Sequence, residues 1–281
     1  MSFPTLTRLA TGLIAALLLA ACSTTETGRT QLTLKSERYL EIESKRQFEL
    51  MRANMPLVQD PVTVEYVACV ANALVETLDG DAAEMYWELA IFNQPTVNAM
   101  VMPGGKISVF AGILDVAQNQ HQLASVIGHE MAHAIAKHAN ERASRREITG
   151  SAISMAAILL GSNDPIMTRS QYERAAHRTS GIYGALSAAE DLGMNRPFSR
   201  MQETEADEIG LIYMARAGFD PRESVQLWQN MSAKNETKVA EMLSTHPSDE
   251  SRLEAHVKQL PEALKIYNEA KAQGRDPQCA R

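Results

Sequence analysis

Two histidines, His129 and His133, lie four residues apart and enclose a glutamate in the sequence His129-Glu130-Met131-Ala132-His133. Apolar residues at helical spacing surround this segment, which predicts a helix with both histidines on one face. Two imidazoles one turn apart can bind the same zinc ion. Glu130 can then act as general base for a water molecule that the zinc activates. The alternative is a chance match, a risk that so short a motif always carries.

A catalytic zinc site has three protein ligands and one position for water, so a third ligand is required. Glu203 and Asp207 lie one turn apart in a second helical pattern farther along the chain. This spacing suits Glu203 as a metal ligand and Asp207 as a carboxylate that holds a ligand histidine from behind. The alternative is a solvated acidic helix face, and we assign the neighbouring Glu205 and Glu208 to such a face.

The elements that would position these residues follow from local patterns. Apolar residues recur at helical spacing in most of the chain, and strand-like alternation is confined to short segments. The expected elements are a helix over 36–54, a helix that begins at Asp60-Pro61, strands over 86–92 and 106–110, and helices from about Gln120 onward. The sequence therefore predicts an α+β fold that is mainly helical.

The composition is that of a folded protein, with 45% hydrophobic and 22% charged residues among 281. The formal net charge is -7 and the sequence pI is near 5.6. Because a nucleic-acid-binding surface is normally basic, we expect no nucleic-acid partner.

The N-terminus has the layout of a secretory signal, with Arg8 followed by an apolar run. The segment Leu19-Ala20-Ala21-Cys22 resembles a bacterial lipobox, in which residues 1–21 are removed and the cysteine is lipidated. Residues 22–35 are rich in Ser and Thr and are expected to tether the lipid to the domain. Ser23 is similar to the outer-membrane sorting pattern, which predicts an anchor in the outer membrane facing the periplasm if the source is Gram-negative, and in the cell envelope otherwise. The alternative is an ordinary cleaved signal.

Two further cysteines, Cys69 and Cys279, form an even pair once Cys22 is assigned to lipid. In an oxidising compartment they can form one disulfide that ties the C-terminus to the early part of the domain. The alternative, that they are two unrelated thiols, has equal support, because the sequence does not give the distance between them in the fold.

The two motifs together resemble the zinc metalloendopeptidase family of HtpX, the CAAX prenyl protease, the Oma-type proteases, BepA and LoiP. Further matches are similar to family segments in the same order: Asn98-Ala99, Pro103-Gly104-Gly105, Gly112-Ile113-Leu114, Ser199-Arg200 and Thr245-His246-Pro247-Ser248 with Arg252. The resemblance covers residues 55–260 and leaves 261–281 as a C-terminal tail. It is strongest to the LoiP/BepA-like periplasmic lipoproteins. It implies a zincin, gluzincin-like peptidase domain with a small sheet at the edge of the active-site cleft.

The resemblance also assigns roles to residues. It implies one zinc ion per chain held by His129, His133 and Glu203, with Glu130 as general base and Asp207 behind the ligands. The strand over 106–110 would lie at the cleft edge and pair with an extended substrate. Its pairing residues would be Ile107, Ser108, Val109 and Phe110.

For each of three features near the motifs, two roles are compatible with the sequence. By resemblance His246 would be an inhibitory fourth ligand, whereas by its local sequence it would cap or pack beside Pro247. Arg252 would line the cleft or form a structural ion pair. Residues 162–198 would form a lid over the cleft or a helical hairpin. The remaining histidines, His138 among them, are expected to be solvated or to cap helices.

Two functions are compatible with these residues. The first is a zinc metalloendopeptidase that cuts internal peptide bonds of misfolded or misassembled envelope proteins. The second is a mainly non-proteolytic factor that holds strands in the same cleft, with the outer-membrane assembly machinery as its partner. The intact Glu130 favours the first, because a holding factor does not need a carboxylate directed at a water on the metal.

Overall fold

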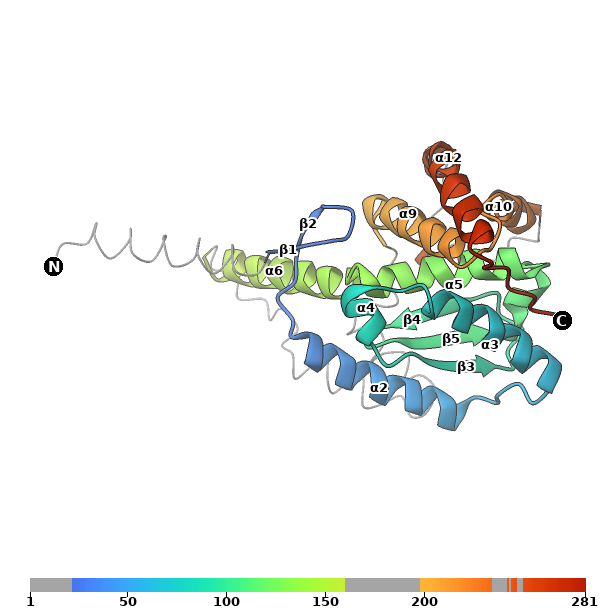
Figure 1. The fold of residues 1–281 in the computed structure, drawn as a ribbon. Coiled ribbons are helices and arrows are strands. Elements are labelled where there is room, and N and C mark those ends of the chain that lie inside the picture. Colours follow the sequence, from blue (N-terminus) through green and yellow to red (C-terminus); the bar gives the residue numbers. More distant parts are fainter. Residues whose placement is uncertain (1–21, 160–197, 234–241, 243, 247–249) are drawn as a thin grey trace.

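The computed structural model describes residues 22–159, 198–233, 242, 244–246 and 250–281. Helices dominate, and a small sheet lies among them (Figure 1), which confirms the predicted mainly helical α+β class. The helices are α2 (Glu37–Asn54), α3 (Pro61–Val75), α4 (Gly80–Glu84), the 3₁₀ helix η1 (Ala111–Asp115), α5 (Gln120–Ile135), α6 (His138–Leu159), α9 (Arg200–Arg216), α10 (Glu223–Ala233) and α12 (Glu250–Ala272). The strands are β1 (Cys22–Thr24), β2 (Thr30–Leu32), β3 (Glu88–Phe92), β4 (Ala99–Met102) and β5 (Lys106–Phe110).

The sheet that borders the site has three strands in the order β3-β5-β4. β5 pairs in parallel with β3 and antiparallel with β4. The prediction that residues 106–110 pair with a substrate at the cleft edge is therefore wrong, because β5 is central, paired on both sides and buried along its whole length. β4 is the edge strand. Strand periodicity identifies a strand but does not identify its neighbours.

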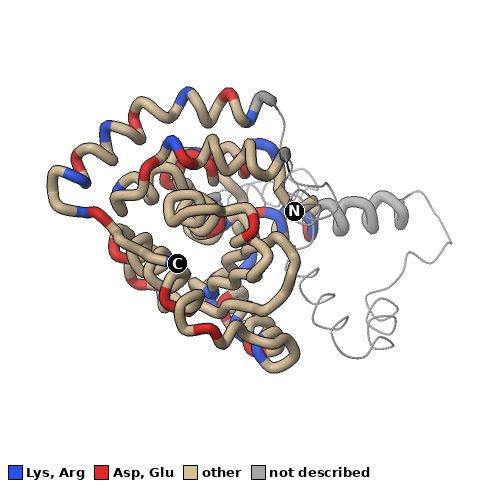
Figure 2. The backbone as a smooth tube through the Cα atoms, turned by 90° about the vertical axis from the view of Figure 1, so that its right-hand side faces the viewer, with Lys and Arg blue, Asp and Glu red and all other residues tan. Residues whose placement is uncertain are grey.

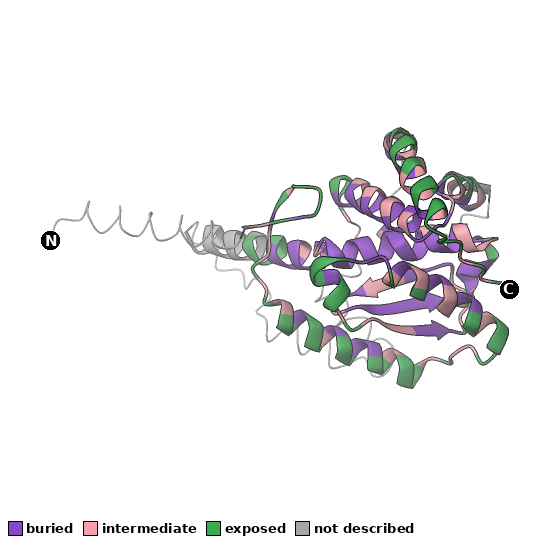
Figure 3. Cartoon of the chain, viewed as in Figure 1, coloured by how far each residue is buried: buried purple, intermediate pink, exposed green. Residues whose placement is uncertain are grey.

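The two faces of this sheet pack against different helices. Ile91, Ile107 and Val109 belong to the main core, together with residues of α3 and α5. Phe92 and Phe110 face the other way and pack with Phe48 of α2 in a smaller cluster. Figure 3 shows β5 and α5 as continuously buried segments. The sheet and α2 therefore support α5 from one side.

The predicted N-terminal helix is α2. Leu40 and Phe48 are buried, whereas Tyr39 and Ile42 are exposed. The predicted start of α3 is confirmed, because the helix begins at Pro61 and Asp60 caps it by accepting the backbone N–H of Thr63.

The segment 22–35 is not an unstructured tether in this structure. β1 and β2 form an antiparallel hairpin that lies beside α6 and α9 (Figure 1). Arg29, between the two strands, forms ion pairs with Glu141 of α6 and Glu205 of α9. Serine and threonine content indicated a linker, but the hairpin is held by contacts with residues far away in the sequence.

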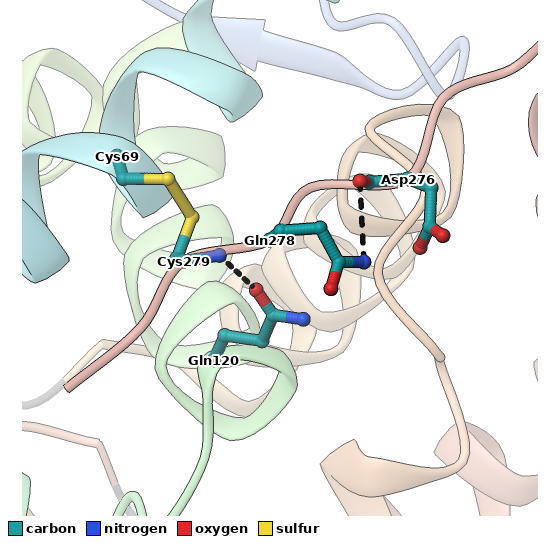
Figure 4. The surroundings of a disulfide bond; sticks show 5 residues. All are labelled: Cys69, Gln120, Asp276, Gln278 and Cys279. Atoms are coloured by element: carbon teal, nitrogen blue, oxygen red, sulfur yellow. Dashed lines mark hydrogen bonds between the residues drawn. A yellow bond between two sulfur atoms is a disulfide. The ribbon is translucent and has the colours of Figure 1, made fainter.

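The predicted boundary at residue 260 falls inside a helix. α12 continues through it to Ala272, and Ala263 and Ala270 are buried. The last residues are fixed as well, because Cys279 forms a disulfide with Cys69 of α3 across a sequence separation of 210 residues (Figure 4). The C-terminal segment is thus part of the folded domain.

In the described part of the chain, no helix is long and apolar enough to cross a membrane. Lysine and arginine are interspersed with aspartate and glutamate over this part (Figure 2). The predicted signal segment, 1–21, and all of the predicted lid except Phe198 lie outside the described residues.

Candidate metal centre

The metal-binding motifs meet where α5 crosses α9. Gly128 and Gly210 form the contact, and a Cβ atom on Gly210 would lie 2.8 Å from the backbone nitrogen of His129. Only a residue without a side chain allows this approach. Asn119 caps α5, and Ser199 with Gln202 forms a capping box on α9. The close crossing places the glutamate motif of α9 directly beside the histidine motif of α5.

Four buried side chains direct donor atoms at one point, namely His129, His133, Glu203 and His246, whose donor atoms all lie within 4.8 Å of one another. The Nε2 atoms of His129 and His133 are 3.1 Å apart. Glu203 Oε1 lies 3.4 Å from His133 Nε2. His246 Nδ1 lies 3.3 Å from His129 Nε2 and 3.1 Å from Glu203 Oε1.

These separations fit a tetrahedral zinc ion. Bonds of about 2.0–2.2 Å at tetrahedral angles place neighbouring donor atoms about 3.3–3.5 Å apart. The four separations given above lie within a few tenths of an ångström of these values, and imidazoles and carboxylates are ligands that zinc prefers. The cluster therefore suits zinc. It contains the three predicted ligands and His246, for which a ligand role was one of two interpretations.

Behind His129, the carboxylate of Asp207 accepts a hydrogen bond from the imidazole ring, with His129 Nδ1 2.9 Å from Asp207 Oδ1. Arg252 donates to Asp207 at 2.6 Å and lies 2.5 Å from Glu203 Oε2. Burial alone would raise the pKa of Asp207, but hydrogen bonds from Arg252 and His129 hold it well below its usual range. Arg252 thus forms a buried ion pair, the second of its two interpretations.

His133 is supported differently. Its Nδ1 lies 2.8 Å from Nδ1 of His138, and His138 Nε2 lies 2.9 Å from Glu205 Oε2. His138 was expected to be solvated or to cap a helix, and Glu205 to be solvated; instead both are buried, and the His138 ring bonds to His133 and Glu205. Lys137, with φ 56°, lies in the short link between α5 and α6, which follow one another end to end (Figure 1), and His138 is the first residue of α6. Phe198 stacks on the His133 ring, with centroids 3.7 Å apart.

Glu205 is ionised in its buried position. Burial opposes ionisation, but hydrogen bonds from His138, Thr25, Thr27 and Arg29 lower its pKa to about 2. These partners come from α6 and from the N-terminal hairpin, so no local pattern in the sequence around Glu205 indicates them.

Glu130 faces a cleft of about 270 Å³ beside the donor cluster. Its Oε1 lies 3.3 Å from Nε2 of His246, and burial raises its pKa. The cleft is lined by His133, His246 and Phe198, by the edge strand β4, and by apolar side chains of α2. Of the strand residues predicted to meet substrate, Phe110 alone lines the cleft, while Ile107, Ser108 and Val109 lie in the central strand away from it.

Comparison with known proteins agrees with this geometry. The chain is 32% identical over 256 residues to the mitochondrial metalloendopeptidase OMA1 of Saccharomyces cerevisiae, covering 85% of this chain and 66% of that protein. It is 30% identical to the beta-barrel assembly-enhancing protease of Yersinia pestis, covering 72% of this chain and 40% of that protein. It is 28% identical to the beta-barrel assembly-enhancing protease of Escherichia coli, again covering 72% of this chain and 40% of that protein.

The chain thus spans about half the length of the curated relatives it matches. The model of peptidase family M48 matches residues 61–259, which include α5, α9 and the three-stranded sheet. The chain therefore belongs to peptidase family M48.

Proposed function

We propose that this protein is a zinc-dependent endopeptidase that hydrolyses internal peptide bonds, with His129, His133 and Glu203 as the zinc ligands. The observation that carries the proposal is the buried donor cluster with near-tetrahedral separations beside a glutamate and a cleft. Zinc in this position supplies a Lewis acid that polarises the scissile carbonyl and makes water a nucleophile near neutral pH. The names of the relatives, which are metalloendopeptidases and proteases, support the same reaction.

Glu130 is the proposed general base. Its carboxylate is buried at the cleft wall, and burial raises its pKa toward the range in which a carboxylate can both accept and release a proton. It takes a proton from the attacking water and delivers it to the leaving amine. Asp207 holds His129 in the tautomer whose Nε2 faces the metal.

His246 is proposed to hold the site closed. Its Nδ1 faces the other three donors, so it takes the position that a catalytic site reserves for water. Cleavage then requires the His246 ring to move away. This arrangement favours its interpretation as an inhibitory ligand over that of a local cap.

The proposed substrates are unfolded or misassembled polypeptides. β4 borders the cleft as the edge strand, and an extended segment can pair with an edge strand through backbone hydrogen bonds. Such pairing needs a free extended segment, which folded proteins rarely offer. Cleft walls formed by methionine and other apolar side chains of α2 and β4 suit apolar segments of varied sequence.

The proposed location is the cell envelope, with Cys22 lipidated and the domain facing the periplasm in a Gram-negative source. The lipobox-like segment supports it, and so does similarity to a beta-barrel assembly-enhancing protease. Membrane fractionation of cells that express the wild type or Cys22→Ala tests this. Release of the Cys22→Ala protein from the membrane fraction is expected, and equal membrane association of both would contradict lipid anchoring.

A second candidate is the mainly non-proteolytic holding factor for outer-membrane assembly, which His246 in the fourth ligand position favours. Cleavage of unfolded casein decides between the two. We expect internal cuts, identified by sequencing the products, that stop when zinc is chelated and return when zinc is restored. Binding of casein without cleavage, by the wild type and by a variant without His246, would favour the holding factor.

A further inference from the structure

We propose that His138 and Glu205 are positioning residues for the metal ligand His133, and that the N-terminal hairpin fixes them in place. The inference rests on the ligand set of the proposed function. It assigns a role in metal binding to residues 25–29, which are far from the zinc motifs in the sequence.

The hydrogen-bond pattern has one consistent direction. If Nε2 of His133 binds the metal, the neutral ring carries its hydrogen on Nδ1 and donates to Nδ1 of His138, 2.8 Å away. His138 then carries its hydrogen on Nε2 and donates to Glu205 Oε2, 2.9 Å away. Both rings stay neutral, and each nitrogen has a single role. The chain of contacts therefore fixes the tautomer and the plane of His133, as carboxylates behind ligand histidines do in other zinc sites.

The hairpin holds the far end of this chain. The hydroxyl groups of Thr25 and Thr27 donate to Glu205 Oε1, and Arg29 Nε donates to Glu205 Oε2 at 2.6 Å. The remaining guanidinium nitrogens of Arg29 donate to both oxygens of Glu141, at 3.0 and 2.9 Å. Arg29 thus links the hairpin to α6 and α9 at once, with charge-assisted bonds that are mostly shielded from water.

The two ligand histidines of α5 are therefore supported from different parts of the molecule. His129 relies on Asp207 and Arg252, which belong to α9 and α12. His133 relies on α6, on Glu205 and, through Glu205, on the hairpin. Glu205 and Arg29 are 176 residues apart in the sequence. A displacement of the hairpin would remove three of the hydrogen-bond donors to Glu205 and leave its buried charge poorly compensated.

The test measures metal binding rather than cleavage. Zinc affinity is determined for the full chain by competition with a chromogenic chelator, and the visible absorption spectrum of the Co²⁺-substituted protein reports the ligand geometry. His138→Leu removes both hydrogen bonds at similar volume, whereas His138→Asn keeps an acceptor near the place of Nδ1. We expect zinc affinity to fall by about 10–100-fold in His138→Leu. His138→Asn should recover part of this loss.

Two further variants extend the test along the chain of contacts. Glu205→Gln keeps the shape and removes the charge, and Arg29→Met removes the main donor from the hairpin. Both should weaken zinc binding, by about tenfold or more for Glu205→Gln, and both should shift the Co²⁺ spectrum. Either effect would remain measurable if His138→Leu failed to fold.

His121→Leu is the control. His121 also lies on α5, but its ring accepts the backbone N–H of Asp220 and has no hydrogen bond to the donor cluster. Wild-type affinity and spectrum are expected for it. The inference is overturned if His138→Leu and Glu205→Gln bind zinc like the wild type with an unchanged Co²⁺ spectrum. That result is distinguishable from failure of the proposed function, in which the wild type binds zinc but cuts no polypeptide.

Discussion

The imidazole of His246 lies between Glu130 and Glu203, with its Nε2 3.3 Å from Oε1 of Glu130 and its Nδ1 3.1 Å from Oε1 of Glu203. One ring therefore contacts both Glu130 and the donor cluster. Under the proposed function this arrangement is a closed site, with His246 in the fourth ligand position and Glu130 beside it.

Removal of this ring should activate the enzyme. In His246→Ala the fourth position becomes accessible to water and Glu130 loses its contact with the imidazole. The variant also loses the hydrogen bond between His246 and Glu203. A hydrogen bond to a charged group contributes about 1.5–3 kcal/mol, which corresponds to roughly a 10–100-fold faster cleavage of casein.

His256→Ala is the matched control, because His256 is also buried in this region but hydrogen-bonds to Ser224 Oγ instead. It should leave the rate near that of the wild type. A His246→Ala variant that keeps its zinc and cuts no faster than the wild type would show that His246 does not limit access.

Gly210→Ala should disturb the donor cluster by pushing apart the two helices that carry it, α5 and α9. The added methyl would lie 2.8 Å from the His129 backbone nitrogen, so α5 and α9 would have to separate. We expect a loss of about 1–3 kcal/mol in the free energy of unfolding, together with weaker zinc binding, because Glu203 moves with α9. Urea unfolding and chelator competition measure both. Met201→Ala, at an exposed position of the same helix, should change neither stability nor zinc binding. A Gly210→Ala protein with the stability and zinc affinity of the wild type would contradict the close contact between α5 and α9.

The disulfide should contribute strongly to stability. Cys69 and Cys279 close a loop across 210 residues, and cross-links of long loops typically contribute about 2–5 kcal/mol. Urea unfolding with and without reductant measures this contribution. Reductant should destabilise the wild type to the level of a Cys69→Ser/Cys279→Ser double variant, which should itself be insensitive to reductant. Equal stability of the wild type in both conditions would be evidence that the bond is absent in solution.

Glu141 should contribute stability that is lost in acid. Burial opposes its ionisation, but hydrogen bonds from Arg29 and Gln202 lower its pKa below 4.5. A carboxylate whose pKa is lower in the folded state stabilises that state above the unfolded value, and this contribution disappears as the pH falls through the folded pKa. Glu141→Gln should therefore be less stable than the wild type at pH 7, and the difference should shrink below about pH 4.5.

Urea unfolding at pH 7 and pH 4 tests this expectation. Glu147→Gln, an exposed position of the same helix that pairs with Lys35, should have little effect at either pH. A stability difference for Glu141→Gln that stays constant from pH 7 to pH 4 would contradict the predicted linkage.

Much of the metal centre was predictable because its chemistry follows local rules. The four-residue spacing of His129 and His133 fixes a shared helix face, and the same spacing relates Glu203 to Asp207. His246 was found through family resemblance, because a lone histidine beside a proline has no periodic signal. The strand over 106–110 and the helix over 36–54 were also placed correctly in the sequence.

The parts that could not be predicted depend on contacts between distant segments. The partners of Glu205 lie as far as 180 residues away in the sequence. The residues next to Glu205 in the sequence therefore do not indicate that its side chain is buried. The order of strands in the sheet depends on pairing, and β5 was therefore mistaken for the edge strand. The N-terminal hairpin was missed for the same reason, since its polar sequence is stabilised by Glu141 and Glu205.

The central claim is tested most directly by cleavage of casein with wild type and Glu130→Gln, with the zinc content of both proteins measured in the same samples. Glu130 faces the cleft but is not one of the donor residues, so its amide variant should retain about one zinc ion per chain. The account predicts that the wild type cuts and that Glu130→Gln, with equal zinc, is slower by at least about 100-fold. Equal cleavage by both proteins at equal zinc content would contradict it.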